Sequence, residues 1–383
     1  MLDNIKIKGF RSLKDVSIPL RNLNVIIGPN GSGKTAFLDI FLLLCEAARG
    51  HLQDGIFARG GLEAILCKKG CGYLEIEISY SRSQEIIEVD YYIKLSQRIR
   101  TAEIIREVLA ERVSPNRPNP FVHINSNEGD VQYFSKLQAD KEKPAKGYIY
   151  EETALSQIPQ IAMYYEPNEF RLALSQTAFY SGLDVSPRAP LRLPQELRPV
   201  KLPGPNGEYL FSTLYNLSQE NEPTYKVIID SLKAAFPGFD HLTFPLVGAG
   251  QTTLAWHDSN FKEPFYPSQL SEGSLRFLWL ATILLSPDLP PITLIDEPEV
   301  SMHPELIHHL ASLLQDASMR TQLIVATHSD RLIRWLKPEN VLVADKEDGV
   351  TTLTWADTMD LEKWLKEYTL DQLWLMGEMG GRP

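Results

Sequence analysis

The chain has 383 residues, of which 43% are hydrophobic and 23% are charged, and its formal net charge at pH 7 is −11. These values are ordinary for a globular protein of two or three lobes, and the acidic balance gives no overall sign of a nucleic-acid-binding surface. No apolar run in the sequence approaches the roughly 20 residues that a membrane-spanning helix needs, and the N-terminus lacks the basic and apolar regions of a signal peptide. We therefore expect a cytoplasmic protein that does not contact a membrane.

The first strong signal is a glycine-rich loop between a predicted strand and a predicted helix. Residues 23–27 form a short β-branched apolar run, which is typical of a buried strand, and residues 35–42 begin an apolar-periodic helix. In this context the loop predicts backbone N–H groups wrapped around a phosphate at the helix N-terminus. Lys34 is expected to contact the β- and γ-phosphates and the Thr35 hydroxyl to bind Mg²⁺. The predicted phosphate loop reads Gly28-Pro29-Asn30-Gly31-Ser32-Gly33-Lys34-Thr35.

The middle of the chain changes in character twice. Residues 72–134 contain alternating apolar and polar runs, such as 73–80, which predict the strands of an antiparallel sheet. Residues 135–150 are polar and rich in lysine and are expected to form a mobile loop. From residue 151 to about 268, helical patterns alternate with proline-rich connectors. No long heptad pattern occurs, so the sequence predicts no coiled-coil arms.

Three features in the first half of the chain leave alternatives open. Cys67 and Cys71 flank a glycine turn, but a structural zinc site needs about four ligands and no second pair is visible, so ordinary thiols are expected. Arg59 precedes two glycines, in either a loop near a nucleotide or an ordinary turn. Gln157 is a candidate Q-loop glutamine, although an exposed polar residue is the simpler interpretation.

A serine- and glycine-containing segment, Leu270 to Ser274, precedes the strongly apolar helix predicted at 275–285. Ser271 is a good N-cap, and Gly273 allows a backbone or a phosphate to approach closely. The helix N-terminus is thus a second anion-binding site without a lysine of its own. One phosphate loop and one such site suggest two chains that exchange sites across a two-fold axis. A plain helix cap is the alternative.

Acidic residues and a histidine end two further predicted strands. The apolar run 291–295 predicts a central parallel strand, and it ends in Asp296 and Glu297 at the sheet edge where α/β proteins bind ligands. Asp296 suits a Mg²⁺ site, and Glu297 suits the activation of an attacking water. His328 ends a second run, 323–326, and could donate a hydrogen bond to the γ-phosphate at the same edge.

The order of these segments resembles ABC-type P-loop ATPases, with Walker A, signature, Walker B, D-loop and switch-histidine motifs. Residues 2–15 resemble the opening of RecF, SMC and OLD-family proteins, and the blocks 270–277, 296–304 and 321–329 resemble predicted bacterial AAA/ABC-like ATPases related to OLD proteins. The resemblance implies an α/β fold of ABC type, with a central mostly parallel sheet, an antiparallel β subdomain and an inserted helical lobe.

The resemblance also implies roles for individual residues. Ser271 and Gly273 would complete the ATP site of a partner, with 301–304 as the D-loop between protomers, and Arg11 would lie near the nucleotide. Glu272 and Ser274 depart from the transporter signature LSGGQ, which argues against a transporter subunit. The remaining roles are phosphate binding by Lys34, Mg²⁺ binding by Thr35 and Asp296, general-base catalysis by Glu297, and γ-phosphate sensing by His328.

These interpretations divide the chain into three parts. Residues 1–70 and 269–383 are expected to form a split ABC/RecA-like ATPase lobe, residues 71–134 an antiparallel β subdomain, and residues 135–268 a helical and proline-rich lobe that leads into the signature helix. The Glu297 and His328 motifs also argue against a small-molecule P-loop kinase.

We therefore predict an ATP- and Mg²⁺-dependent ATPase that forms a homodimer with ATP and acts as a switch or motor coupled to nucleic acid, with DNA as one candidate, or to a nuclease partner, in DNA repair or anti-phage defence. The alternative is a nucleotide-controlled interaction module whose effector is a separate chain. About 55 residues follow His328, fewer than the TOPRIM nuclease of full OLD proteins needs, and no acidic nuclease cluster is apparent outside the ATP motifs.

Overall fold

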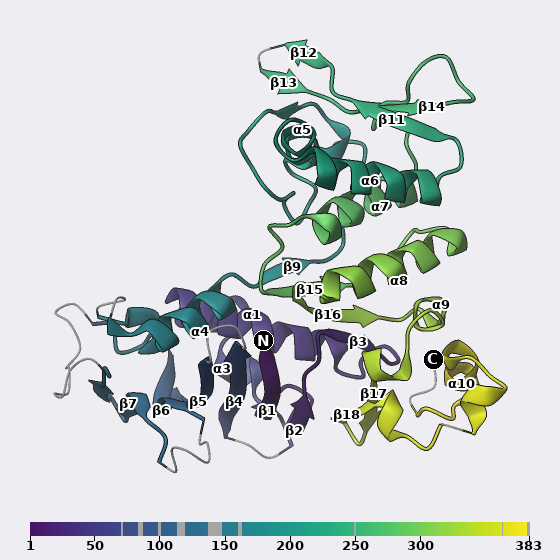
Figure 1. Cartoon of the computed structure of the whole chain (residues 1–383). Coiled ribbons are helices and arrows are strands. Elements are labelled where there is room, and N and C mark those ends of the chain that lie inside the picture. Colours follow the sequence, from purple (N-terminus) through teal and green to yellow (C-terminus); the bar gives the residue numbers. More distant parts are fainter. Residues whose placement is uncertain are drawn as a thin grey trace.

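The computed structural model places a broad base of two β-sheets beside a second lobe of helices and short hairpins that rises from it (Figure 1). None of the helices described is long and apolar enough to cross a membrane. The structure describes residues 1–69, 72–82, 87–98, 101–112, 119–136, 148–159, 163–248, 250–361 and 363–380.

The central sheet has six strands in the order β18-β17-β3-β16-β15-β9. Its strands are parallel except for β18, which pairs antiparallel with β17. Every residue of β3 and β16 is buried, as expected for strands covered on both faces. The strands are β3 (Leu23–Ile27), β9 (Ala178–Tyr180), β15 (Ile292–Asp296), β16 (Gln322–Thr327), β17 (Val341–Glu347) and β18 (Val350–Trp355).

A second, antiparallel sheet has seven strands in the order β2-β1-β4-β5-β6-β7-β8. Buried and half-buried residues alternate along β4, which matches the alternation in its sequence. Residues 2–19, which the sequence analysis assigned to the ATPase lobe, supply two strands of this sheet. The strands are β1 (Leu2–Phe10), β2 (Leu13–Pro19), β4 (Tyr73–Arg82), β5 (Ile87–Arg98), β6 (Thr101–Glu111), β7 (Val122–Asn127) and β8 (Asp130–Tyr133).

Two hydrophobic cores lie on opposite faces of the central sheet, because alternate residues of a strand point to opposite faces. Ile26 and Ala326 belong to the core shared with α1 and the antiparallel sheet, whereas Val25 and Val325 belong to the core shared with α7 (Glu272–Leu285) and α8 (Pro304–Ser318). The first core contains α1 (Lys34–Arg49), α2 (Leu52–Ala58), α3 (Leu62–Ile65), η1 (Leu155–Gln157) and α4 (Tyr165–Ser175).

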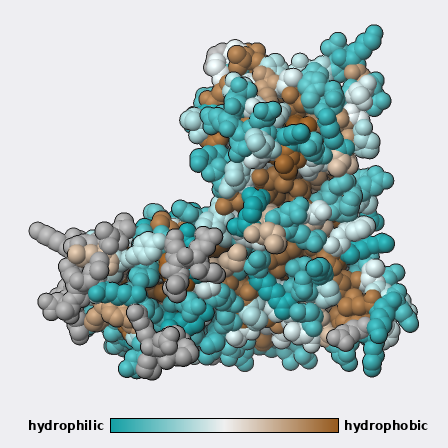
Figure 2. Space-filling view, in the orientation of Figure 1, coloured by the Kyte–Doolittle hydropathy of each residue, from teal (hydrophilic) through white to brown (hydrophobic). Residues whose placement is uncertain are grey.

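The second lobe is built around the other core. The sequence predicted helices and proline-rich connectors here, and the structure adds strands of two to five residues, which are too short to produce a periodic signal. Figure 2 shows a largely hydrophilic face on which apolar residues gather mainly over the lower part of this lobe. Its elements are η3 (Pro190–Arg192), β10 (Gln195–Glu196), α5 (Leu210–Glu220), α6 (Glu222–Ala235), β11 (Phe239–Thr243), β12 (Leu246–Gly248), β13 (Gln251–Thr252), β14 (Ala255–Asp258) and α7 (Glu272–Leu285).

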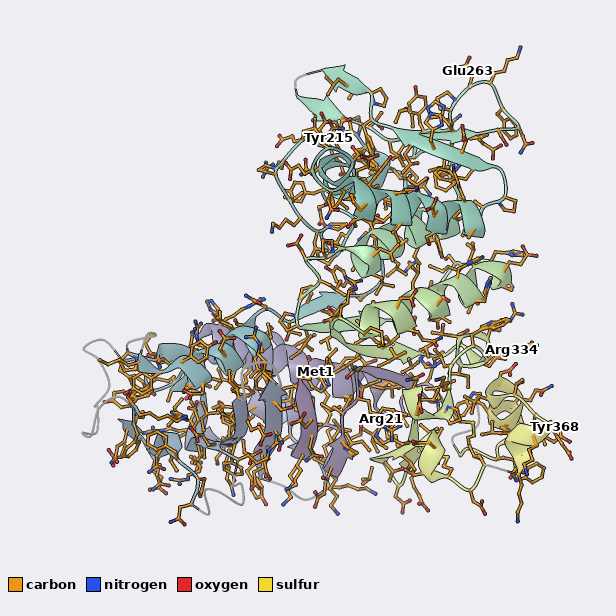
Figure 3. The ribbon with its side chains drawn as sticks, viewed as in Figure 1. Met1, Arg21, Tyr215, Glu263, Arg334 and Tyr368 are labelled. Atoms are coloured by element: carbon orange, nitrogen blue, oxygen red, sulfur yellow. The ribbon has the colours of Figure 1, made fainter. Side chains whose placement is uncertain are left out.

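The C-terminal segment returns to the base and contacts the N-terminal strands. The Arg21 guanidinium, from the residue labelled in Figure 3, donates to the Glu339 carbonyl at 2.6 Å and lies 4.0 Å from the Trp355 ring centroid. These contacts explain how segments more than 300 residues apart form one unit. The C-terminal elements are α8 (Pro304–Ser318), α9 (Asp330–Ile333), η4 (Pro338–Asn340), η5 (Ala356–Thr358), η6 (Trp364–Lys366) and α10 (Leu370–Met376).

Candidate nucleotide-binding site

The predicted phosphate loop joins β3 to α1 and leaves the helix N-terminus available to an anion. Gly31 and Gly33 adopt φ angles of 76° and 106°, which favour glycine. Helix α1 begins without a side-chain cap and has no acidic residue in its first turn, so its first N–H groups remain available. The side chain of Thr35 is exposed in this turn.

Lys34 folds back over the loop in the free protein. Its side chain is buried, and Nζ donates to the Gly28 carbonyl at 2.7 Å and to the Pro29 carbonyl at 3.0 Å. A phosphate that binds here must therefore replace two hydrogen bonds to the loop itself. Burial lowers the pKa of Lys34 to about 8, although the carboxylates of Asp296 and Glu297 oppose the shift.

Nucleotide affinity is expected to fall as the pH rises from 7 to 9. A bound phosphate favours the charged lysine and raises its pKa again, so binding takes up a proton wherever free Lys34 is deprotonated. Affinity is then greatest below the free pKa of about 8 and declines by up to about tenfold per pH unit above it. Titrations of a fluorescent ADP analogue at pH 7, 8 and 9 measure this, and an unchanged affinity would exclude Lys34 as the titrating group.

The acidic strand end and the histidine meet the phosphate loop at one edge of the central sheet. Strands β3, β16 and β15 are neighbours and parallel, so the residues that follow them lie together. Glu297 has a φ angle of 49°, and its N–H donates to the Ala326 carbonyl at 2.8 Å, which turns the chain away from β15. The His328 ring lies between the side chains of Lys34 and Glu297. Its Nδ1 is 3.3 Å from Lys34 Nζ, and its Nε2 is 3.4 Å from Glu297 Oε1.

These contacts favour one tautomer of His328. An ammonium group can only donate, so Nδ1 accepts from Lys34 and Nε2 carries the ring proton that faces Glu297. Burial lowers the pKa of His328, the charge of Lys34 lowers it further, and Glu297 opposes both effects. Burial and the Glu297 charge raise the pKa of Asp296. The edge therefore holds a neutral imidazole between a cation and a carboxylate.

Arg11 lies beside the first turns of α1. It has a φ angle of 50°, and its guanidinium pairs with Asp39 at 2.6 Å. Arg59, at the end of α2, binds the same Asp39 at 2.7 Å and Glu46 at 2.5 Å. Of the two interpretations of the Arg59 segment, the structure shows a helix end whose arginine is tied to α1.

The signature segment forms a second helix N-terminus, on α7. Ser271 caps the helix by accepting from the Ser274 N–H at 3.1 Å, and its side chain is exposed. Gly273 is packed against the predicted D-loop of the same chain, because a Cβ there would lie 2.6 Å from the Ser301 carbonyl oxygen. The signature segment and the D-loop both line a cavity of about 680 Å³, and Phe236 also lines it.

Residues 23–334, more than half of the chain, match the family described as "AAA domain, putative AbiEii toxin, Type IV TA system". The chain belongs to this family. Its fold is similar to that of an Smc head bound to the C-winged helix domain of ScpA, with a TM-score of 0.54 and 16% identity over 95% of this chain and 99% of that one. It is also similar to the Smc head domain with an extended coiled coil from Pyrococcus furiosus, bound to the C-terminal domain of ScpA, with a TM-score of 0.52 and 13% identity over 96% and 99% of the two chains.

A stretch of 38 residues is 50% identical to the OLD nuclease of Thermus scotoductus. It spans 10% of this chain and 7% of the nuclease. The chain thus matches only a small part of that relative's length. Together with the family match and the Smc heads, this likeness confirms the predicted ABC-type P-loop ATPase fold of the SMC/OLD type. The protein is an ATP-binding and ATP-hydrolysing member of its family, and the roles of individual residues stay predictions.

Two of the earlier alternatives concern residues away from the ATPase site. Gln157 lies near the C-terminal end of α1, where its side chain accepts from the Ile149 N–H at 2.8 Å and donates to the Ile149 carbonyl at 2.9 Å. The structure therefore does not bring it to the phosphate loop. Cys67 is a buried free thiol, and Cys71 lies outside the described residues.

Two residues near the site were missed from sequence. Glu299 accepts a hydrogen bond from Thr327, and burial raises its pKa; its place two residues after Glu297 was the available signal. Thr351, on β18, contacts the phosphate loop from more than 300 residues away, and nothing in its local sequence marks it.

Proposed function

We propose that this ATPase works as an ATP-dependent homodimer in which each nucleotide lies between the phosphate loop of one subunit and the signature segment of the other. The main support is that Ser271 and the D-loop line an open cavity whose lining contains no residue of the phosphate loop. A helix N-terminus such as that of α7 suits a phosphate oxygen. Because one chain holds the two half-sites apart, a second copy could complete each of them.

The side chains at the sheet edge suit a magnesium–ATP substrate. Thr35 offers an exposed hydroxyl and Asp296 a half-buried carboxylate, and such oxygen ligands are the kind that Mg²⁺ prefers. When bound, Mg²⁺ would neutralise charge on the β- and γ-phosphates. We propose that Lys34 then exchanges its loop carbonyls for phosphate oxygens, a switch that its two hydrogen bonds to the loop make possible.

For hydrolysis, we propose that Glu297 is the general base. It would take a proton from a water whose oxygen attacks the γ-phosphorus, while the bond to ADP breaks and inorganic phosphate leaves. The Nε2 proton of His328 faces Glu297 in the free protein. That proton would be available to the γ-phosphate once the Glu297 carboxylate turns to the attacking water. Arg11 forms an ion pair with Asp39 on α1. We propose that its guanidinium adds a positive charge to this site.

A mixing experiment tests whether the ATP sites are shared between subunits. Lys34→Ala should inactivate the phosphate-loop half, and Ser271→Arg the signature half, so each variant alone is expected to be inactive. A 1:1 mixture should recover roughly a quarter of wild-type activity, since about half of random dimers are mixed and each of these holds one intact site. Phosphate release measures this recovery. A mixture as inactive as its components would rule out shared sites.

We further propose that the nucleotide cycle controls an effector carried by a separate chain, acting on DNA. The likeness to an OLD nuclease supports the link to nucleic acid. Among the described residues, the only group of three side chains suited to a metal is Glu111, His123 and Glu166, and the Lys136 ammonium lies between its two carboxylates, 2.6 Å from that of Glu166. That arrangement is an ion-pair cluster rather than a nuclease centre.

The ATPase rate with and without duplex DNA tests the proposed coupling, together with affinity purification of the tagged protein from its native cells. A DNA-stimulated rate, or co-purification of a nuclease that is released by ADP, would support it. A rate indifferent to DNA and a protein that purifies alone in every nucleotide state would contradict it.

A further inference from the structure

The C-terminal hairpin formed by β17 and β18 touches the phosphate loop at both of its ends. At the first end, a Cβ on Gly28 would lie 2.3 Å from the Ala344 carbonyl oxygen on β17. At the other end, a Cβ on Gly33 would lie 2.3 Å from Thr351 Oγ1 on β18. These two glycines are therefore required by the closeness of the hairpin, in addition to any approach of phosphate. The hairpin therefore packs directly against the phosphate loop.

Thr351 makes the polar contacts between this hairpin and the phosphate loop. Its side chain is 1% exposed, and Oγ1 lies 2.7 Å from the Ser32 carbonyl oxygen and 2.7 Å from Ser12 Oγ. A hydroxyl carries one proton, and a carbonyl can only accept. Thr351 therefore donates to Ser32 while it accepts from Ser12, and its own N–H donates to the Ser12 carbonyl at 2.8 Å. Ser12 follows Arg11, so the same residue joins the turn that carries Arg11 to the loop.

The hydrogen bond to the Ser32 carbonyl has a consequence for the next N–H group. In a trans peptide the C=O of one residue and the N–H of the next point in opposite directions across a rigid plane. With the Ser32 carbonyl held toward Thr351, the Gly33 N–H must point away from the hairpin. Gly33 has a φ angle of 106° and no Cβ, so little else prevents this peptide from rotating.

We propose that Thr351 is a positioning residue that keeps the peptide between Ser32 and Gly33 in the orientation that binds phosphate, and that couples the loop to the Arg11 turn. The inference rests on the proposed role of the phosphate loop, which it deepens. The hairpin is suited to this task because Asp348 and Gly349, with φ angles of 51° and 79°, form a tight turn that sets the strand register. That register directs Thr351 inward and leaves Thr352 exposed.

Three variants test the proposal. Thr351→Val keeps the shape of the side chain but leaves the buried Ser32 carbonyl without its donor, and is expected to weaken binding of a fluorescent ADP analogue about tenfold. Thr351→Ser keeps the hydroxyl and should remain within about threefold of wild type. Thr352→Val makes the same substitution at the exposed neighbour and should bind as wild type does. Unfolding temperatures without nucleotide identify any general loss of structure.

The pattern across the variants decides the question. Because the hydroxyl is expected to act on binding, Thr351→Val should raise the KM for ATP about tenfold while kcat changes less. Wild-type affinity in Thr351→Val would overturn the proposal, as would equal losses in Thr351→Val and Thr352→Val. Binding of ADP to one chain's own loop requires neither dimerisation nor hydrolysis. A failed mixing experiment therefore leaves this test intact, whereas absence of ADP binding to wild type would refute the role of the loop itself.

Discussion

Replacing Glu297 by glutamine is expected to lower ATP turnover at least about a hundredfold while ATP stays bound. Glutamine has nearly the same shape as glutamate but cannot accept the proton of the attacking water. Its amide can still occupy the place 3.4 Å from His328. The substitution also removes a negative charge beside Asp296 and Lys34, which should not weaken the binding of an anionic nucleotide. Phosphate release at saturating ATP measures the rate.

The same variant should accumulate the proposed dimer. If ATP joins two subunits and hydrolysis separates them, blocked hydrolysis leaves them joined, so size-exclusion chromatography with light scattering should show twice the monomer mass in ATP and the monomer mass in ADP. Glu339→Gln is a matched control, because it changes an exposed carboxylate far from the sheet edge. Turnover of Glu297→Gln at the wild-type rate would show that another group activates the water.

Replacing Lys34 by alanine is expected to weaken ATP binding at least about a hundredfold. The lysine is buried in the loop with its ammonium 2.7 Å from the Gly28 carbonyl, so the substitution removes a cation at the place where phosphate is expected to bind. Removing it also deprives His328 of the donor to Nδ1. The unfolding temperature should change little, since burying the ammonium costs desolvation that its two loop contacts offset.

Isothermal titration with the non-hydrolysable ATP analogue AMP-PNP measures this loss directly. Lys366→Ala is the matched control, because that lysine is exposed in η6 and belongs to none of the proposed nucleotide-binding segments. We expect its affinity to equal that of wild type. If Lys34→Ala bound the analogue as tightly as wild type, the phosphates would have to bind elsewhere, and the pH dependence predicted for Lys34 would disappear with it.

Several parts of the site could be predicted from sequence because they are local. The phosphate loop is a contiguous pattern between a strand and a helix, and its conformation depends mainly on glycine φ angles and a helix N-terminus. Asp296 and His328 end apolar runs, and residues at the ends of parallel strands share one sheet edge whatever the intervening chain does. Their place at one sheet edge therefore followed from strand direction, whereas the strand order that makes them neighbours came from the structure.

Other parts depended on contacts that no local pattern encodes. The edge strand β9 has three residues, so the sequence could not distinguish it from a connector. Gly273 was expected to approach a backbone or a phosphate, and in this chain it packs on the Ser301 carbonyl. Gln157 has the right residue type for a Q-loop, but its side chain accepts a hydrogen bond from the Ile149 N–H.

By itself, the sequence determined the class of this protein, its phosphate loop and the acidic and histidine residues at its strand ends, because each depends on short-range periodicity, turn chemistry or strand polarity. Only the tertiary structure decided that Lys34, His328 and Glu297 form a connected chain of contacts, and that Thr351 holds the Ser32 carbonyl from the far end of the sequence. Such contacts depend on the placement of the elements to within a few tenths of an ångström. That placement is set by the packing of two cores on opposite faces of one sheet.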